Sequence, residues 1–276
     1  MALPGLGVLA WVLFLMGSGA SLTSCSDLTR ALKSDSIAYK REVARKYFEK
    51  KEYERGLPLL EELIIIDRGT EHAEEVNYMH AKSYFGMKDY ILSSFYLANF
   101  TRTFPTSKYA EECAFLSAYC HYKNSPNYEL DQGDTDRAIN ELQLFLVRYP
   151  QTALRDSCNG LIDVLRDKLE IKAFKGAMQY YRTRHYRAAH VALERFAQEW
   201  PNSDYREEAL STLFRADHAL AVNSVEDKKE ERIRDAIRSY HNFVDAFPSS
   251  DDLGENERLF TVLLTELDNL KTKTTP

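Results

Sequence analysis

A four-residue motif recurs four times along this chain: an aromatic residue, a proline, any residue, and then a serine or threonine. Proline cannot continue a helix, and it disfavours helical geometry in the residue before it. A serine or threonine two positions later is a good N-cap for a following helix. Each motif therefore predicts the end of one helix and the start of the next. The copies are Phe104-Pro105-Thr106-Ser107, Tyr149-Pro150-Gln151-Thr152, Trp200-Pro201-Asn202-Ser203 and Phe247-Pro248-Ser249-Ser250.

The residues that precede each proline repeat as well. A small residue, a larger apolar residue and a phenylalanine stand 12, 8 and 5 positions before it, a spacing that places all three on one face of a helix. A further copy ends at Arg68 in place of proline. The small residues are Gly56, Ser93, Ala138, Ala189 and Ala236; the larger ones are Leu60, Leu97, Leu142, Leu193 and Tyr240; Leu63, Phe100, Phe145, Phe196 and Phe243 fill the third position.

A second helix in each repeat is predicted from a small residue followed by an aromatic three positions later, as in Ala44–Tyr47, Ala81–Tyr84 and Ala177–Tyr180. This pattern resembles the tetratricopeptide repeat. The predicted fold is all-α: a superhelical solenoid of about five helix pairs over residues 37–248. An unpaired helix at 156–172 is expected between repeats three and four, and a capping helix after Pro248.

The predicted organisation has five segments. Residues 1–24 are a lipoprotein-type signal peptide, and 25–36 are a lipidated tether. Repeats one to three occupy 37–155. The inserted helix with repeats four and five occupies 156–248, and the capping helix with a short tail occupies 249–276.

The N-terminus predicts export. Leu6 to Met16 is almost wholly apolar, which is too short to span a bilayer but fits a signal-peptide core. The sequence Leu22-Thr23-Ser24-Cys25 resembles a bacterial lipobox, in which the cysteine receives lipid. The n-region lacks the usual lysine or arginine. Two alternatives remain: ordinary cleavage after Ser18-Gly19-Ala20, or an unmodified Cys25 thiol.

Motifs for chemistry are absent from the sequence. Its seven histidines include no pair at the spacing of a helical metal site, and no phosphate-binding loop or nucleophile elbow occurs in the mature chain. No cofactor, no metal and no enzyme activity is expected. The net charge of −6 gives no support for nucleic-acid binding. The three cysteines after Cys25 are interpreted as small core residues.

A solenoid of this kind has a concave surface lined by the first helix of each repeat. Basic and aromatic residues in that groove could bind an extended peptide that ends in a carboxylate. The alternative is that the aromatics simply pack between helices. The predicted groove residues are Arg41, Arg45, Phe48, Tyr78, Lys82, Phe85, Tyr119 and Tyr122, with Phe115 beside them.

A lipobox followed by five such repeats, with a helix inserted after the third, resembles the BamD family of outer-membrane lipoproteins. The most specific stretches are Asp67-Arg68-Gly69-Thr70-Glu71, Ser117-Ala118-Tyr119-Cys120 with Ser125-Pro126 and Leu130-Asp131-Gln132, and Lys228-Lys229-Glu230-Glu231-Arg232. The resemblance implies a scaffold of the β-barrel assembly machinery, lipid-anchored at the periplasmic face of the outer membrane.

The partners that this resemblance implies are the periplasmic domains of a BamA-like barrel protein, nascent outer-membrane proteins and other lipoproteins of the machinery. The N-terminal repeats would take the substrates, and repeats four and five with the final helix would take the barrel protein. The alternative function is that of another periplasmic tetratricopeptide lipoprotein, an adaptor related to peptidoglycan or cell division.

Overall fold

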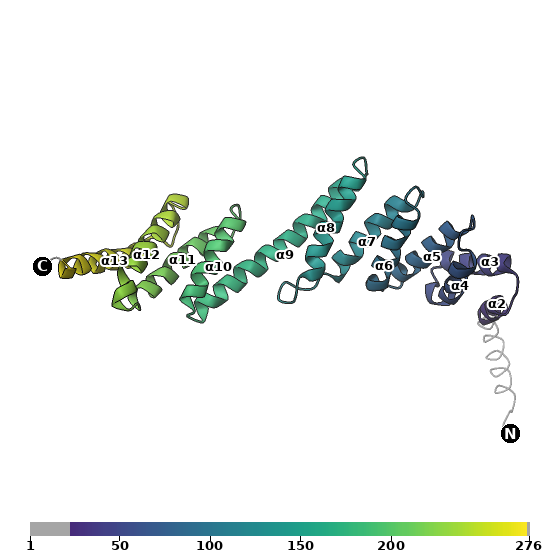
Figure 1. The fold of residues 1–276 in the computed structure, drawn as a ribbon, viewed down its shortest axis with the longest axis horizontal. Helices are drawn as coiled ribbons and strands as arrows, with labels where there is room; N and C mark the ends of the chain where they lie inside the picture. The colour runs from purple at the N-terminus through teal and green to yellow at the C-terminus, as the bar shows by residue number, and fades with distance from the viewer. Residues whose placement is uncertain (1–22, 275–276) are drawn as a thin grey trace, which may run out of the picture. The chain divides into compact units, whose positions relative to one another are not determined.

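The structure, a computed structural model, describes residues 23–274. That part of the chain contains twelve α-helices and no strand (Figure 1). Consecutive helices pack in antiparallel pairs, as in tetratricopeptide repeats, so the predicted all-α solenoid is confirmed. The helices are α2 (Thr23–Leu32), α3 (Ile37–Glu49), α4 (Tyr53–Ile66), α5 (Ala73–Gly86), α6 (Tyr90–Thr103), α7 (Ala110–Asn124), α8 (Gly133–Arg148), α9 (Arg155–Arg182), α10 (Tyr186–Glu199), α11 (Arg206–Val222), α12 (Glu226–Ala246) and α13 (Leu253–Thr274).

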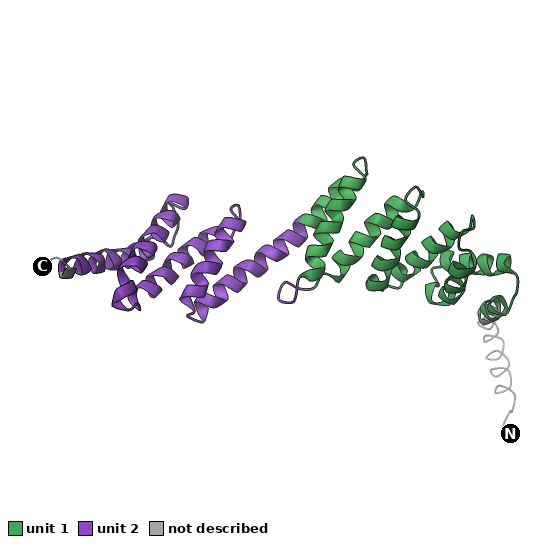
Figure 2. Cartoon of the chain, viewed as in Figure 1, with its two compact units in different colours: residues 1–126, 132–162 green, residues 127–131, 163–276 purple. Residues whose placement is uncertain are grey.

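Two compact units divide these helices (Figure 2). Unit 1 contains the chain up to Pro126 together with Gln132–Ile162, and so holds α2 to α8. Unit 2 contains Asn127–Asp131 and Asp163–Pro276, and so holds α10 to α13. Helix α9 begins in unit 1 and ends in unit 2.

The proline motifs end helices α6, α8, α10 and α12 at the predicted places. In each case the aromatic residue is the C-cap, and its backbone N–H donates to the carbonyl of the phenylalanine four residues earlier, as Phe104 does to Phe100. The small-residue and phenylalanine positions are buried in all repeats. At Gly56 a Cβ would lie 3.1 Å from the Cβ of Tyr47, which explains the need for a small side chain there.

Tight turns join the two helices of a repeat. Lys51, Lys88 and Arg184 occupy these turns with φ near +60°, a left-handed conformation that non-glycine residues adopt infrequently. Gly86 ends α5 close to Tyr53, and a Cβ added there would lie 2.0 Å from the tyrosine ring. The connections are thus set by backbone geometry and by close packing.

Two segments differ from the expectation. The inserted helix and the first helix of repeat four are one continuous helix, α9, because no proline separates 156–172 from the residues that follow. Most of α2 lies in the segment predicted as a tether, and the helix packs on α3 and α4 and buries Ala31 completely.

The final helix α13 packs on α11 and α12. Leu263 and Leu267 are buried in a cluster with Phe214 and Ile233. Leu259 is partly buried against the same cluster, whereas Leu264 is 41% exposed. The helix therefore covers the end of unit 2 through one face only.

Candidate functional site

The predicted groove residues lie together on α3, α5 and α7, the first helices of the three repeats in unit 1. None of them is fully buried: Arg45 is exposed, and the others are half-buried. The aromatic residues contact one another along the row, and the basic residues form ion pairs.

Tyr78 of α5 is at the centre of the first aromatic group. Its ring stacks on Tyr109 with centroids 4.0 Å apart. Phe48 of α3 and Phe100 meet the same ring edge-on, each at 6.2 Å. Burial, followed by its hydrogen bond to Glu112, raises the pKa of the Tyr78 hydroxyl well above its ordinary value. Tyr78 is therefore a neutral hydrogen-bond donor with one side of its ring already covered.

The second aromatic group lies on α7. Tyr119 stacks between Phe115 and Tyr122, with centroid distances of 5.8 and 5.5 Å. Phe85 of α5 contacts Tyr119 at 6.3 Å and so joins this group to the neighbouring repeat. All four rings are half-buried, so part of each faces solvent. The residues thus both pack between helices and contribute to the groove surface.

The basic groove residues already have carboxylate partners. Arg45 makes two hydrogen bonds to Glu75, of 2.9 and 2.7 Å, and Lys82 pairs with Glu112. Glu112 also accepts from the Tyr78 hydroxyl at 2.9 Å. The acceptors lie in the first turn of the next repeat's first helix. A peptide carboxylate would therefore compete with these glutamates for the cations.

Arg41 has a structural partner of the same kind. Its Nε and Nη2 donate to the two oxygens of Asp67, at 2.9 and 2.6 Å, and Asp67 is 1% exposed at the end of α4. The bond to Asp67, more than any other interaction, raises the pKa of the Arg41 guanidinium. Arg41 thus holds the turn that closes repeat one.

The repeat pattern did not predict the acidic partners of Arg45 and Lys82. Glu75 and Glu112 stand in the first turns of α5 and α7, where acidic residues are common because they suit the helix dipole. Their positions within the repeat could have indicated the pairing. Arg45 and Lys82 each stand one position after the small residue of their helix, and Glu75 and Glu112 each stand six positions before the small residue of the next repeat's first helix. Unit 2 repeats the arrangement, where Arg215 of α11 bonds to Asp252 and Glu255 at the start of α13.

A cleft in unit 2 was also missed. Tyr180 of α9 is 47% exposed, although Tyr47 and Tyr84 at the equivalent position are buried. Tyr84 stacks on Tyr96, and the residue in register with Tyr96 in repeat four is the much smaller Ala192. The ring of Tyr180 therefore stays open beside Val191, which is 58% exposed, in an apolar cleft lined also by Tyr186 and Arg187.

The three cysteines after Cys25 lie in the core, as predicted. Cys113, Cys120 and Cys158 are buried free thiols. Burial raises the pKa of Cys113 to about 12 and that of Cys120 to about 11.

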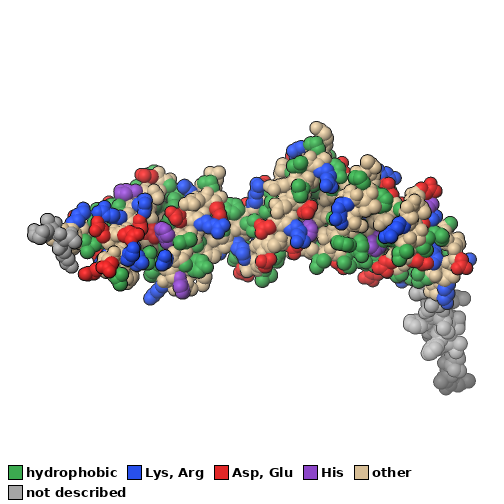
Figure 3. All heavy atoms as spheres, in the orientation of Figure 1, with side chains coloured by type: hydrophobic (Ala, Val, Ile, Leu, Met, Phe, Trp, Pro, Cys, Tyr) green, Lys and Arg blue, Asp and Glu red, His purple; other side chains and the backbone are tan. Residues whose placement is uncertain are grey.

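Within the described part of the chain no three metal-ligating side chains gather at one point. Acidic and basic side chains are interspersed on the face drawn in Figure 3.

The predicted lipid anchor falls at the edge of the structure. Residues 1–22 of the signal peptide lie outside the described residues, and so does the side chain of Cys25, whose backbone belongs to the first turn of α2. Among the helices of residues 23–274, none is both long and apolar enough to cross a bilayer.

Comparison with known proteins gives one match. The model of the family YfiO, described as outer membrane lipoprotein, matches residues 33–232, which includes all of α3 to α11. A search of curated proteins finds no match.

Proposed function

The chain belongs to the YfiO family of outer membrane lipoproteins, the BamD family, and on that premise we propose that it is a scaffold of the machinery that assembles outer-membrane β-barrels. It is held by lipid on Cys25 at the periplasmic face of the outer membrane. It binds unfolded barrel proteins through unit 1 and a BamA-like barrel protein through unit 2. The family match over residues 33–232 is the observation that carries this proposal.

The groove of unit 1 suits an extended apolar peptide. Half-buried aromatic rings on α5 and α7 offer flat apolar faces at a fixed spacing. Because Arg45 and Lys82 are paired with glutamates, the aromatics supply most of the recognition. A carboxylate at the end of a substrate would bind only by displacing Glu75 or Glu112.

The apolar cleft of unit 2 suits the second partner. Tyr180 and Val191 expose a large part of their side chains next to Arg187 and Arg195. Aromatic and arginine residues in one patch are typical of energetically important interface positions. A folded periplasmic domain with apolar residues and a carboxylate would complement this patch.

The second candidate function is a different tetratricopeptide adaptor of the periplasm, with peptidoglycan or cell-division partners. The same groove and anchor would serve it. The identity of the partners separates the two functions.

Photo-crosslinking tests the proposal. A photoreactive amino acid replaces Tyr119 in the groove of unit 1, Val191 in the cleft of unit 2, or, as a control, Ile65, which is 77% exposed on α4 outside both surfaces. We expect position 119 to capture unfolded barrel proteins and position 191 to capture the BamA-like protein, with neither captured at 65. Capture of only cell-wall or division proteins at 119 and 191 would reject the proposal in favour of the adaptor.

A further inference from the structure

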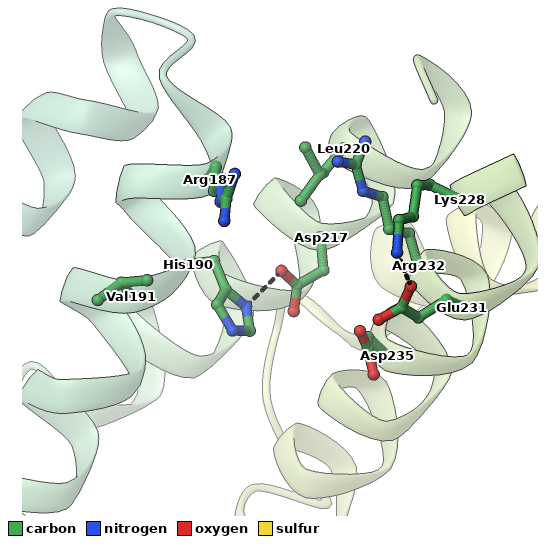
Figure 4. A pocket seen from close by; sticks show the side chains of 9 residues that line it. All are labelled: Arg187, His190, Val191, Asp217, Leu220, Lys228, Glu231, Arg232 and Asp235. Atoms are coloured by element: carbon green, nitrogen blue, oxygen red, sulfur yellow. Dashed lines mark hydrogen bonds and ion pairs between the residues drawn. The ribbon is translucent and has the colours of Figure 1, made fainter. Parts of the chain in front are cut away.

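A second cleft of unit 2 lies between α10, α11 and α12, with a volume of about 280 Å³. Figure 4 shows the side chains of α10 on one side, those of α12 on the other, and Asp217 of α11 between them. This cleft lies outside the predicted groove, and it shares Arg187 and Val191 with the apolar cleft beside Tyr180. Its lining contains Arg187, His190, Leu220, Lys228 and Arg232.

The floor of the cleft is a fixed hydrogen-bond network. Asp217 is 3% exposed and accepts from His190 Nδ1 at 2.7 Å and from the Ser239 hydroxyl at 2.5 Å. The bond to Asp217 is the main reason that the pKa of His190 is raised. Nδ1 is committed to Asp217, and Nε2 lies 3.8 Å from a carboxylate oxygen of Glu194.

The carboxylates in the lining all have partners. Asp217 is satisfied by His190 and Ser239, Glu231 pairs with Lys228 at 3.1 Å, and Asp235 pairs with Arg238. The negative charges of the cleft are therefore already compensated.

Two guanidinium groups are not compensated in this way. Arg187 has no hydrogen-bond or ion-pair partner among the described residues. Arg232 donates Nη1 to the Ser224 hydroxyl at 2.7 Å, which orients the side chain but leaves its charge without a carboxylate. The two arginines come from α10 and α12, the opposite walls of the cleft.

We propose that this cleft binds the phosphate group of a phosphate ester, with Arg187 and Arg232 as its ligands. A guanidinium presents a planar fork of N–H donors that matches the oxygens of a phosphate, and charge-assisted bonds of this type are strong. His190, which the buried Asp217 holds in place, lines the cleft beside the two arginines.

Titration with inorganic phosphate tests the site itself. The full mature chain is titrated with phosphate, or with chloride at matched ionic strength, while NMR follows the His190 imidazole signal. We expect a saturable shift with phosphate, and at least a tenfold loss of affinity in Arg187→Gln and in Arg232→Gln. Arg184→Gln is the control, because Arg184 is exposed in the turn before α10 and does not line the cleft.

A second arm distinguishes the source of the phosphate. Vesicles of phosphatidylglycerol and phosphatidylcholine are tested for cosedimentation with a Cys25→Ser form that lacks the anchor. Binding to phosphatidylglycerol that is lost in Arg232→Gln identifies a lipid headgroup, whereas saturation by phosphate without vesicle binding identifies a soluble phosphate ester. No saturable shift, or a shift that both arginine variants retain, would overturn the site.

Discussion

The carboxylate of Asp67 is almost completely removed from water, and Arg41 compensates its charge through two hydrogen bonds. Removal of one member of a buried ion pair leaves the other charge without compensation. We therefore expect Arg41→Met to lower the free energy of unfolding by about 3 kcal/mol. Denaturant unfolding of unmodified and variant protein measures the loss.

The pair Arg45–Glu75 is the matched control. It has the same bidentate geometry, but both side chains are more than a third exposed. Exposed ion pairs contribute little to stability, so Arg45→Met should lower the free energy of unfolding by less than about 1 kcal/mol. Equal losses in the two variants would show that burial does not set the cost of breaking these pairs.

Gly86 lies too close to the ring of Tyr53 to carry a side chain without a shift. A methyl group at Gly86 would overlap the ring of Tyr53, whereas at Gly176, in the exposed face of α9, it would meet nothing within 4 Å. Gly86→Ala should lower the free energy of unfolding by about 1–3 kcal/mol. Gly176→Ala should leave it unchanged or raise it by up to about 1 kcal/mol, because alanine favours a helix more than glycine does. A destabilising effect confined to Gly176→Ala would contradict the packing described here.

The sequence predicted the core residues better than the contacts at the surface. The positions of Gly56, Leu97 and Phe196 followed from spacing alone, because a repeat must bury the same face each time. The ion pairs of Arg45 and Lys82 did not, because they join separate helices and depend on how successive repeats align. The exposure of Tyr180 required a comparison of Ala192 with Tyr96, a pairing that only the packed helices reveal.

At the scale of the helices, His190 and Asp217 connect α10 with α11. The pKa of His190 is raised above its value of about 6.5 in an unfolded chain. The stability that protonated His190 contributes is therefore fully present below pH 6.5 and is lost as the pH rises through the folded pKa. We expect the stability advantage of the unmodified protein over His190→Gln to shrink between pH 6 and pH 9. An advantage that grows over this range would contradict the assigned direction.

The pKa of His80 is shifted in the opposite direction from that of His190. His80 lies buried on α5 against the rings of Tyr84 and Tyr96, and burial lowers its pKa to about 4. As the pH falls, His80 takes up a proton in the unfolded chain before it does so in the folded protein. The free energy of unfolding therefore decreases as the pH falls from about 6.5 to about 4. Between pH 7 and pH 4, the free energy of unfolding should fall by about 3 kcal/mol less in His80→Phe than in the unmodified protein. Identical pH profiles would show that His80 is protonated without cost in the folded state.

Helix boundaries were predicted where the sequence contains a definite stop. Pro105, Pro150, Pro201 and Pro248 ended helices as expected, because a proline in a helix interior removes a hydrogen bond and clashes with the preceding turn. Helix α9 lacks such a stop, so its full length could not be read from the repeat pattern. Helix α2 was missed because its short polar sequence lies before the first repeat.

For the molecule as a whole, we propose that this lipoprotein binds a BamA-like barrel protein. Affinity purification from its native membrane in mild detergent, with mass spectrometry of the partners and of the N-terminal peptide, tests it most directly. We predict a BamA-like protein in an amount comparable to the bait, and a lipid mass on Cys25. Recovery of the lipidated protein without any barrel protein would contradict the assembly function and favour the adaptor alternative.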